Sequence, residues 1–281
     1  MKKLLSVSLA AVFAAGFATA QDGVVMVGQA PVSSGSEPEA SVEAALMSAN
    51  VWRGMVRNED IVFQPQFTVA QYGFSFNIWA NYDFSSNYAG VDNDISEIDL
   101  SLAYTIPVNL NDFAFDVGIV SYQFPANGGA GAAPGFGVNR KSTSEIFGSA
   151  YWLTFRDYVL PSVQLFQDIN EAKGTYLLFD IVAPYQISDY LWAEVGVNTG
   201  WGSSRYNNYY YGNLGGANDF DKGFSDYNIY GTISYELLDG VTASLNLTYT
   251  GLYGGAIKDA AKKNYEAGEK FWGGVNLSYD F

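Results

Sequence analysis

The stretch VNLSYDF, residues 275–281, decides the fold. Val275, Leu277, Tyr279 and Phe281 are apolar or aromatic, and the three residues between them are polar. Strict alternation with a period of two is typical of a β-strand with two unlike faces. The last residues of a soluble domain are usually loose and polar. We therefore expect this strand to pair with another strand and to face an apolar environment.

The first 20 residues, MKKLLSVSLAAVFAAGFATA, have the features of a secretory signal peptide. Lys2 and Lys3 give a basic start, an apolar run follows, and Ala18, Thr19 and Ala20 form a small-residue cleavage site. An uncleaved membrane anchor is the alternative, but the apolar run is shorter than the about 20 residues of a spanning helix. We expect export and cleavage after Ala20.

Composition narrows the class of protein. The 281 residues include no cysteine and no histidine, so disulfides and a lipid anchor on cysteine are excluded. Loss of the signal peptide changes the formal net charge from −15 to −17, because two lysines and no acidic residues leave. Nucleic acid is therefore not an expected partner. The 30 glycines, 21 tyrosines and 19 phenylalanines, with 15% charged residues, are typical of an all-β chain rich in turns.

Alternating segments recur along the chain and predict about twelve strands. They are longer than the about five or six residues of ordinary strands, and they suit the about 9 to 11 residues that cross a bilayer at a tilt. The expected strands cover residues 42–53, 60–71, 73–83, 95–107, 112–124, 142–155, 158–168, 174–185, 190–201, 225–236, 240–250 and 269–281.

The connections alternate in length. Those after even-numbered strands are tight, as at Tyr72-Gly73 and Asp239-Gly240, and most of those after odd-numbered strands are long, as over residues 202–224. Short turns on one side and long loops on the other are typical of outer-membrane barrels. The sequence predicts an all-β fold: a 12-stranded antiparallel transmembrane β-barrel (roughly 10 to 14 strands), with short periplasmic turns and long extracellular loops. The barrel is expected over residues 41–281, after a flexible periplasmic segment or lumen plug over residues 21–40.

A soluble sandwich or lipocalin-like barrel, with its apolar face inside, is the alternative. Strand length, loop asymmetry and the signal peptide favour the inverted arrangement, in which acidic side chains must line the lumen because charges are destabilising in hydrocarbon. The expected lumen-lining acids are Asp83, Glu97, Asp99, Asp116, Glu145, Asp168, Asp180 and Glu194.

The terminal strand FWGGVNLSYDF resembles the C-terminal recognition signal of Gram-negative outer-membrane β-barrels, which end on Phe after apolar or aromatic residues at alternate positions. The resemblance implies that the barrel-assembly machinery reads this strand, that it pairs with the first strand, and that the protein resides in the bacterial outer membrane in contact with its lipid. The matching positions, which form the expected assembly signal, are Phe271, Val275, Leu277, Tyr279 and Phe281.

A second, local resemblance concerns the stretch SANVWRGMVRNEDIVFQPQFTV, residues 48–69. Together with GFSFNIWANYDF and SEIDLSLAY, which follow it, this stretch is similar to the opening of a family of uncharacterised outer-membrane proteins. That family carries an aromatic-x-x-Arg-Gly or aromatic-Arg-Gly element after the first strand, and the matching positions here are Trp52, Arg53 and Gly54. That family implies the fold and no activity. From the residues alone, we expect Arg53 to be a cation at the barrel rim, or in the lumen paired with acids such as Glu97 or Asp99.

The sequence does not indicate an enzyme. Outer-membrane barrel enzymes use a histidine as general base or proton carrier, and this chain has none. Without cysteine, it also lacks a thiol nucleophile and the usual metal-ligand spacings. Paired acids could act as acid and base, but in a barrel they ordinarily serve solvation and ion pairing. We expect no catalytic residues, no metal and no cofactor.

Two of the long loops have distinct compositions. Residues 202–226 hold a cluster of tyrosines and asparagines, which suits an outer aromatic girdle or, alternatively, a sugar-binding surface. Residues 256–270 are charged and rich in alanine, which predicts a short helix. The function that we expect is a narrow porin-like channel for small, preferably cationic or neutral solutes. The alternative is a structural or surface-interaction barrel with a filled lumen and no transport, since twelve strands lie between filled and open barrels.

Overall fold

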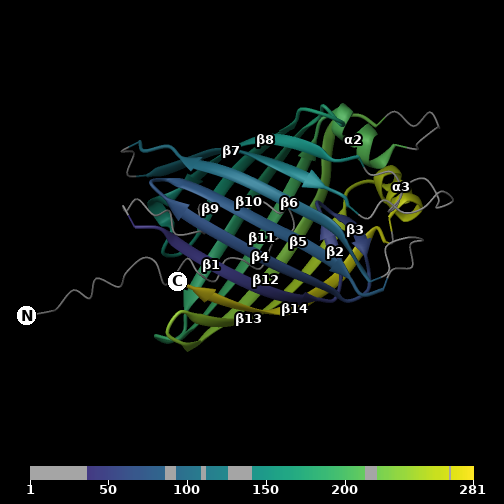
Figure 1. The fold of residues 1–281 in the computed structure, drawn as a ribbon. Coiled ribbons are helices and arrows are strands. Elements are labelled where there is room, and N and C mark those ends of the chain that lie inside the picture. The colour runs from purple at the N-terminus through teal and green to yellow at the C-terminus, as the bar shows by residue number, and fades with distance from the viewer. Residues whose placement is uncertain (1–36, 86–92, 109–111, 126–140, 213–219, 266) are drawn as a thin grey trace, which may run out of the picture.

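The structure, a computed structural model, is a closed barrel of twelve antiparallel strands (Figure 1). It describes residues 37–85, 93–108, 112–125, 141–212, 220–265 and 267–281. The predicted signal peptide and most of the segment 21–40 lie outside these residues. The barrel strands are β1 (Glu39–Met47), β4 (Val62–Gln71), β5 (Phe74–Asp83), β6 (Asp94–Thr105), β7 (Phe113–Gln123), β8 (Thr143–Trp152), β9 (Leu160–Asp168), β10 (Thr175–Gln186), β11 (Leu191–Gly202), β12 (Gly223–Leu238), β13 (Val241–Leu252) and β14 (Glu269–Asp280).

The strand that contains VNLSYDF closes the barrel. β14 pairs with β13 on one side and with β1 on the other, with Leu46 opposite Val275, and β1 pairs in turn with β4. The backbone N–H of Phe281 donates to the carbonyl oxygen of Ala40 over 2.8 Å. The predicted twelve-stranded fold and the pairing of first and last strands are confirmed.

The apolar face of the strands points outward. On β13, Leu245 and Leu247 are each 46% exposed, whereas Asn246 between them is 2% exposed. A soluble barrel would show the opposite distribution, because its apolar side chains would fill the interior. The polar interior and apolar exterior confirm a barrel that faces lipid, as expected for an outer-membrane protein.

Aromatic side chains collect near both ends of the barrel exterior. In two of these pairs the ring centroids of Phe113 and Trp152 lie 6.2 Å apart at one end, and those of Phe224 and Tyr253 lie 5.9 Å apart at the other. Such girdles mark the two membrane–water interfaces of transmembrane barrels. Exposed aromatic residues at the end that holds the tight turns include Tyr72, Phe74, Phe113, Trp152, Phe155, Tyr158, Tyr185, Tyr190, Tyr235, Tyr279 and Phe281, and those at the opposite end include Phe84, Phe224, Tyr253 and Phe271.

The two ends differ in their connections, as the sequence predicted. The C-terminus and tight turns lie at one end, and the helices α2 (Ser204–Tyr211) and α3 (Gly255–Asn264) lie at the other (Figure 1). Tyr72 and Gly73 adopt φ angles of 53° and 81°, which suits a two-residue hairpin turn. The short helix expected within residues 256–270 is confirmed as α3. Among the described helices, none is long and apolar enough to cross a membrane.

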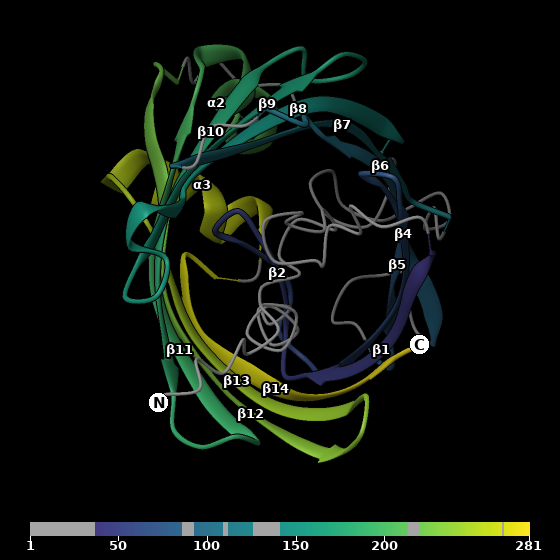
Figure 2. The same ribbon diagram turned by 90° about the vertical axis from the view of Figure 1, so that its left-hand side faces the viewer.

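The expected strand over residues 42–53 is wrong in its second half. The barrel strand β1 stops at Met47, and the chain then forms a separate two-stranded sheet, β2 (Asn50–Trp52) and β3 (Met55–Asn58). A view along the barrel shows β2 inside the ring of strands (Figure 2). All three residues of β2 are buried, so the two-faced pattern of a lipid-facing strand ends here. Likewise, Leu153–Phe155 form a 3-10 turn, η2, instead of continuing β8.

Candidate functional site

The inner hairpin, defined as β2, β3 and their turn, is the main feature of the barrel interior. The turn residues Arg53 and Gly54 have φ angles of 46° and 80°, as a tight type I′ hairpin requires. A Cβ atom on Gly54 would lie 2.5 Å from both Asp226 Cβ and Leu252 Cδ2. The tip therefore rests against the wall formed by β12 and β13, where only glycine fits.

Arg53 connects the tip of the inner hairpin to strands β7 and β8, on another side of the barrel. Its guanidinium forms a two-pronged ion pair with Glu145 of β8, with Nη1–Oε1 at 3.0 Å and Nη2–Oε2 at 2.8 Å. The hydroxyl of Tyr122 on β7 donates to the same Oε2 over 3.0 Å. Both charged side chains are only 1% exposed. A fork of parallel hydrogen bonds is the strongest geometry for an arginine and a carboxylate.

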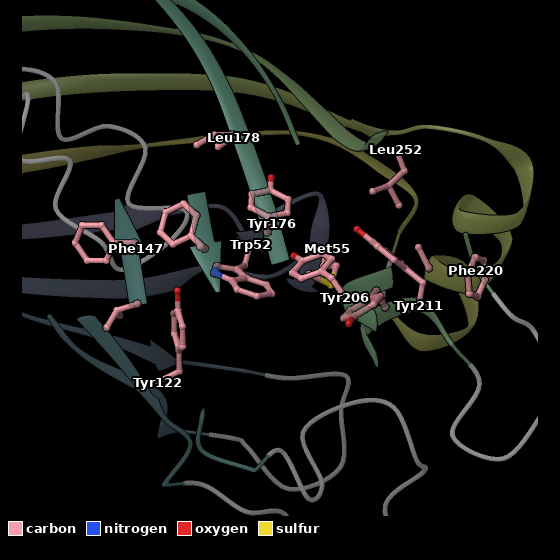
Figure 3. Packing of buried hydrophobic residues seen from close by; sticks show 14 of the residues in the cluster. Trp52, Met55, Tyr122, Phe147, Tyr176, Leu178, Tyr206, Tyr211, Phe220 and Leu252 are labelled. Carbon is pink, nitrogen blue, oxygen red and sulfur yellow. The ribbon is translucent and has the colours of Figure 1, made fainter. Parts of the chain in front are cut away.

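Aromatic rings enclose the faces of the Arg53 guanidinium. Its Cζ lies 4.3 Å from the ring centroid of Tyr176, 4.4 Å from that of Phe166 and 4.5 Å from that of Trp52. Figure 3 shows Tyr176 on one side of Trp52 and Tyr122 on the other. These contacts add cation–π attraction to the ion pair and exclude water from it.

The second strand of the inner hairpin, β3, is bound to the barrel strands β5 and β6 by an ion pair and a hydrogen bond. Arg57 forms an ion pair with Glu97, and its Cζ lies 4.2 Å from the Trp52 ring centroid. The Trp52 ring therefore contacts two guanidinium groups. Asn58 Nδ2 donates to Asp83 Oδ1 over 2.6 Å. Together with Arg53, these bonds tie the inner hairpin to strands on several sides of the barrel.

Helix α2 covers the inner hairpin from the outer end. Tyr206 and Tyr211 are both 0% exposed, and the Tyr211 hydroxyl donates to the carbonyl oxygen of Arg53 over 3.3 Å. Burial raises the pKa of both tyrosines well above its ordinary value, so both stay neutral. Ser203 caps the helix by accepting from the Tyr206 N–H. The girdle and sugar-surface interpretations of this loop are wrong for these two residues, which pack inside.

The eight acids singled out in the sequence all have buried side chains, none more than 8% exposed. Three of them, Glu145, Glu97 and Asp83, bind the inner hairpin. Asp168 instead organises the short loop after β9, where it accepts from the N–H groups of Asn170 and Lys173 over 3.0 Å each. The others lie elsewhere on the inner wall: Asp99 on β6, Asp116 beside Thr105, Asp180 beside Tyr230, and Glu194 on β11.

The partner expected for Arg53 differs from the one observed. Arg53 was expected at the rim or beside Glu97 or Asp99, but its carboxylate partner is Glu145, and Glu97 is bound by Arg57. Sequence reasoning missed Arg57 entirely. The repeated spacing in W-R-G-M-V-R, with two arginines four residues apart around a glycine turn, was the available signal.

Basic residues are almost absent from the barrel wall. Among the twelve described barrel strands, Lys270 is the sole lysine or arginine, and it lies 3.5 Å from Glu59 at the outer end. Within the described residues, no group of three or more acidic residues is arranged to hold a metal ion. The described part of the interior therefore carries more acidic than basic groups, and its two buried arginines, Arg53 and Arg57, both belong to the inner hairpin.

A model of a family of bacterial proteins of unknown function, Gcw_chp, matches residues 31–233. The chain belongs to the Gcw_chp family. This match spans the inner hairpin and the strands through most of β12, and it bears out the expected relation to an uncharacterised family. No curated protein is similar enough in sequence to count as a relative of this Gcw_chp member.

Several solved structures similar to this Gcw_chp member are outer-membrane porins or channels. A COG4313 outer membrane channel from Pseudomonas putida F1 matches with a TM-score of 0.51 and 9% identity, covering 87% of this chain and 94% of that one. The KdgM porin in complex with disordered oligogalacturonate matches with a TM-score of 0.50 and 8% identity, covering 86% and 99%. At such identities the likeness shows the fold alone: a small outer-membrane β-barrel. Most of the neighbours are porins, and one, LpxR from Salmonella typhimurium, is an enzyme.

Proposed function

We propose that this protein is a narrow outer-membrane channel for small solutes that are cationic or neutral, and that it is not an enzyme. The observation that carries the proposal is the sign of the charges on the inner wall. Nine buried acids lie on the described barrel strands, namely the eight discussed above and Asp226 of β12, whereas Lys270 is the one basic residue of those strands. Carboxylates inside a low-dielectric wall attract cations and repel anions.

The inner hairpin would then control how much of the lumen is free. It contacts β5, β6 and β8 through side chains and β12 and β13 through its tip. A solute that crosses the barrel must pass beside the hairpin or displace it. Two buried ion pairs, Arg53–Glu145 and Arg57–Glu97, help to hold the hairpin in place. Both must break before the hairpin can move away from the wall.

The ligand of one structural neighbour is not carried over to this chain. The KdgM porin was solved with oligogalacturonate, an anionic sugar polymer. The inner wall described above has the opposite preference, because its charges are acidic and both arginines of the inner hairpin are engaged by carboxylates. This protein therefore shares the fold of that neighbour, and we propose that it passes a different class of solute.

The test is a planar bilayer recording on the purified full-length protein in a salt gradient. We expect discrete conductance steps and a reversal potential of the sign that denotes cation preference. Joint replacement of Asp99, Asp116 and Asp180 by asparagine should move the reversal potential toward zero. The matched control is Glu236→Gln, at the periplasmic end of β12, which should leave it nearly unchanged. An anion-selective pore would contradict the proposal.

A structural barrel without transport is the second candidate, and the packing around Trp52 favours it. That ring and the guanidiniums beside it fill space inside the barrel with buried side chains. This candidate predicts a silent bilayer for three proteins: the full-length chain, a form lacking residues 21–40, and Arg53→Ala. Steps that appear only in Arg53→Ala would support a channel held closed by the inner hairpin.

A further inference from the structure

One buried acid in the barrel interior, Glu194, takes no part in the contacts described so far. It lies on β11 and is 8% exposed. Among the residues that the structure describes, no hydrogen-bond donor or cation is paired with its carboxylate. A buried carboxylate is strongly destabilised unless a donor or a positive charge compensates it. This side chain is therefore short of a partner.

The surroundings of Glu194 combine negative charge with aromatic surface. Its carboxylate interacts electrostatically with that of Asp180 and with the hydroxyl of Tyr230. The Tyr230 hydroxyl donates to Asp180 Oδ1 over 2.8 Å. The Tyr230 ring lies over Gly196, where a Cβ atom would meet its Cζ at 2.1 Å. The ring therefore lies on the inner face of β11, on the same side as Glu194.

A second ring and an apolar cluster complete these surroundings. Trp192 is two residues from Glu194 on the same strand, so both side chains point to the same face. The buried Nε1 of Trp192 has no hydrogen-bond partner among the described residues. Tyr230 also belongs to a buried apolar cluster with Tyr151, Leu160 and Val182. One face of the lumen thus offers carboxylate oxygens beside rings and aliphatic groups.

We propose that Glu194, Asp180, Tyr230 and Trp192 form a binding site for the ammonium group of a small organic cation. The inference rests on the proposed function, because the ligand reaches the site through the lumen. A carboxylate supplies the opposite charge, and ring faces attract alkylammonium groups by cation–π interaction. The apolar cluster suits the carbon substituents of such a cation.

A divalent metal ion fits this site less well. Calcium takes six to eight oxygen ligands, whereas the site offers two carboxylates, one of which already accepts from Tyr230. No group of three acidic residues suited to a metal occurs among the described residues. Apolar neighbours would also leave much of the coordination shell of a metal ion unfilled.

The experiment measures thermal unfolding of the purified, refolded full-length barrel in detergent by the loss of its heat-modifiable gel migration. Tetramethylammonium chloride is the probe, and sodium chloride at equal ionic strength is the reference. We expect the midpoint to rise and saturate with tetramethylammonium only, as binding to the folded state requires. The rise should disappear in Glu194→Gln and persist in Glu236→Gln.

Equal midpoints in tetramethylammonium and sodium, or an unchanged rise in Glu194→Gln, would overturn the site. A rise with calcium chloride alone would overturn the ligand class. If Glu194→Gln does not fold, Glu194→Asp and Asp180→Asn replace it, and each should weaken the response at least severalfold. Bilayer recordings with the same probe separate the two proposals. A silent bilayer together with a midpoint rise that depends on Glu194 would contradict the channel and support the binding site. A cation-selective channel without that midpoint rise would support the channel and contradict the binding site.

Discussion

Replacing Arg53 by alanine should release the inner hairpin while the barrel stays folded. The substitution leaves Glu145 buried beside β7 and β8, with the Tyr122 hydroxyl as its remaining partner among the bonds described above. Removing one partner of a buried ion pair destabilises by about 3 to 5 kcal/mol. The loss falls on the docking of the hairpin, because the ladder of twelve paired strands is untouched.

Backbone strain at Arg53 offsets part of the stabilisation that its ion pair with Glu145 gives to the docked hairpin. Arg53 has a φ of 46°, a region that side chains other than glycine rarely adopt, and such strain amounts to about 1 to 3 kcal/mol. Arg53→Gly removes the guanidinium and the strain together, so it should release the hairpin less than Arg53→Ala does. The double variant Arg53→Ala with Glu145→Gln should also be milder, because it no longer leaves a buried charge unpaired.

Hydrogen exchange of the amides in β2 and β3 is the assay. A loss of about 3 to 5 kcal/mol raises the undocked population by roughly two to four orders of magnitude, and exchange of the hairpin amides should accelerate accordingly. Amides of the barrel strands should keep their protection. Arg205→Ala, an exposed arginine on α2, is the control and should change nothing. Unchanged hairpin exchange in Arg53→Ala would refute the reasoning that the ion pair holds the hairpin.

Three further perturbations test separate parts of the fold. Leu247→Arg should destabilise the barrel in denaturant by about 2 to 4 kcal/mol if the site lies near the bilayer midplane, whereas Asn246→Arg, on the buried face, should be far milder; equal effects would mean that the assignment of faces is wrong. Gly54→Ala should accelerate hydrogen exchange of the hairpin as Arg53→Ala does, since its Cβ would overlap the β12 and β13 side chains. Replacing Tyr279 and Phe281 by aspartate should prevent insertion and heat-modifiable migration in cells, and normal assembly would contradict the role of β14 as assembly signal.

The strands and their faces could be predicted because they depend on local pattern. Along β13 from Val241 to Thr250, for example, more exposed residues alternate with buried ones, and this period of two is visible in the sequence. The same parity put Glu145 and Glu97 on the inner face. The alternation shows which face of the barrel a side chain lies on, but it does not show which side chain it meets across the lumen. That partner depends on how far each strand is shifted relative to its neighbours when the barrel closes. This is why Arg53 was expected beside Glu97 or Asp99 and is instead paired with Glu145.

The inner hairpin could not be predicted from the local sequence pattern, because its position also depends on distant parts of the barrel. Residues 48–53, SANVWR, continue the mixture of small, polar and apolar residues found in β1, EASVEAALM. An isolated hairpin also gains nothing by turning inward. Its position is decided by distant groups: Asp226 and Leu252 leave room only for Gly54, and Glu145 receives Arg53. The tyrosines of α2 were misread likewise, because tyrosine suits both an exposed girdle and a buried lid.

The chemistry of the inner hairpin favours a channel over a permanently filled barrel. A lumen that only has to be filled is served at least as well by apolar side chains, because exchanging a buried ion pair for packed apolar residues is often neutral or stabilising. This barrel instead holds two buried arginine–carboxylate pairs and a strained Arg53 turn at one end of its lumen. Charged groups regain hydration when they move into water, whereas the exposure of apolar groups to water costs free energy. A hairpin built from arginines can therefore leave its docked position at a smaller cost than an apolar plug of equal size.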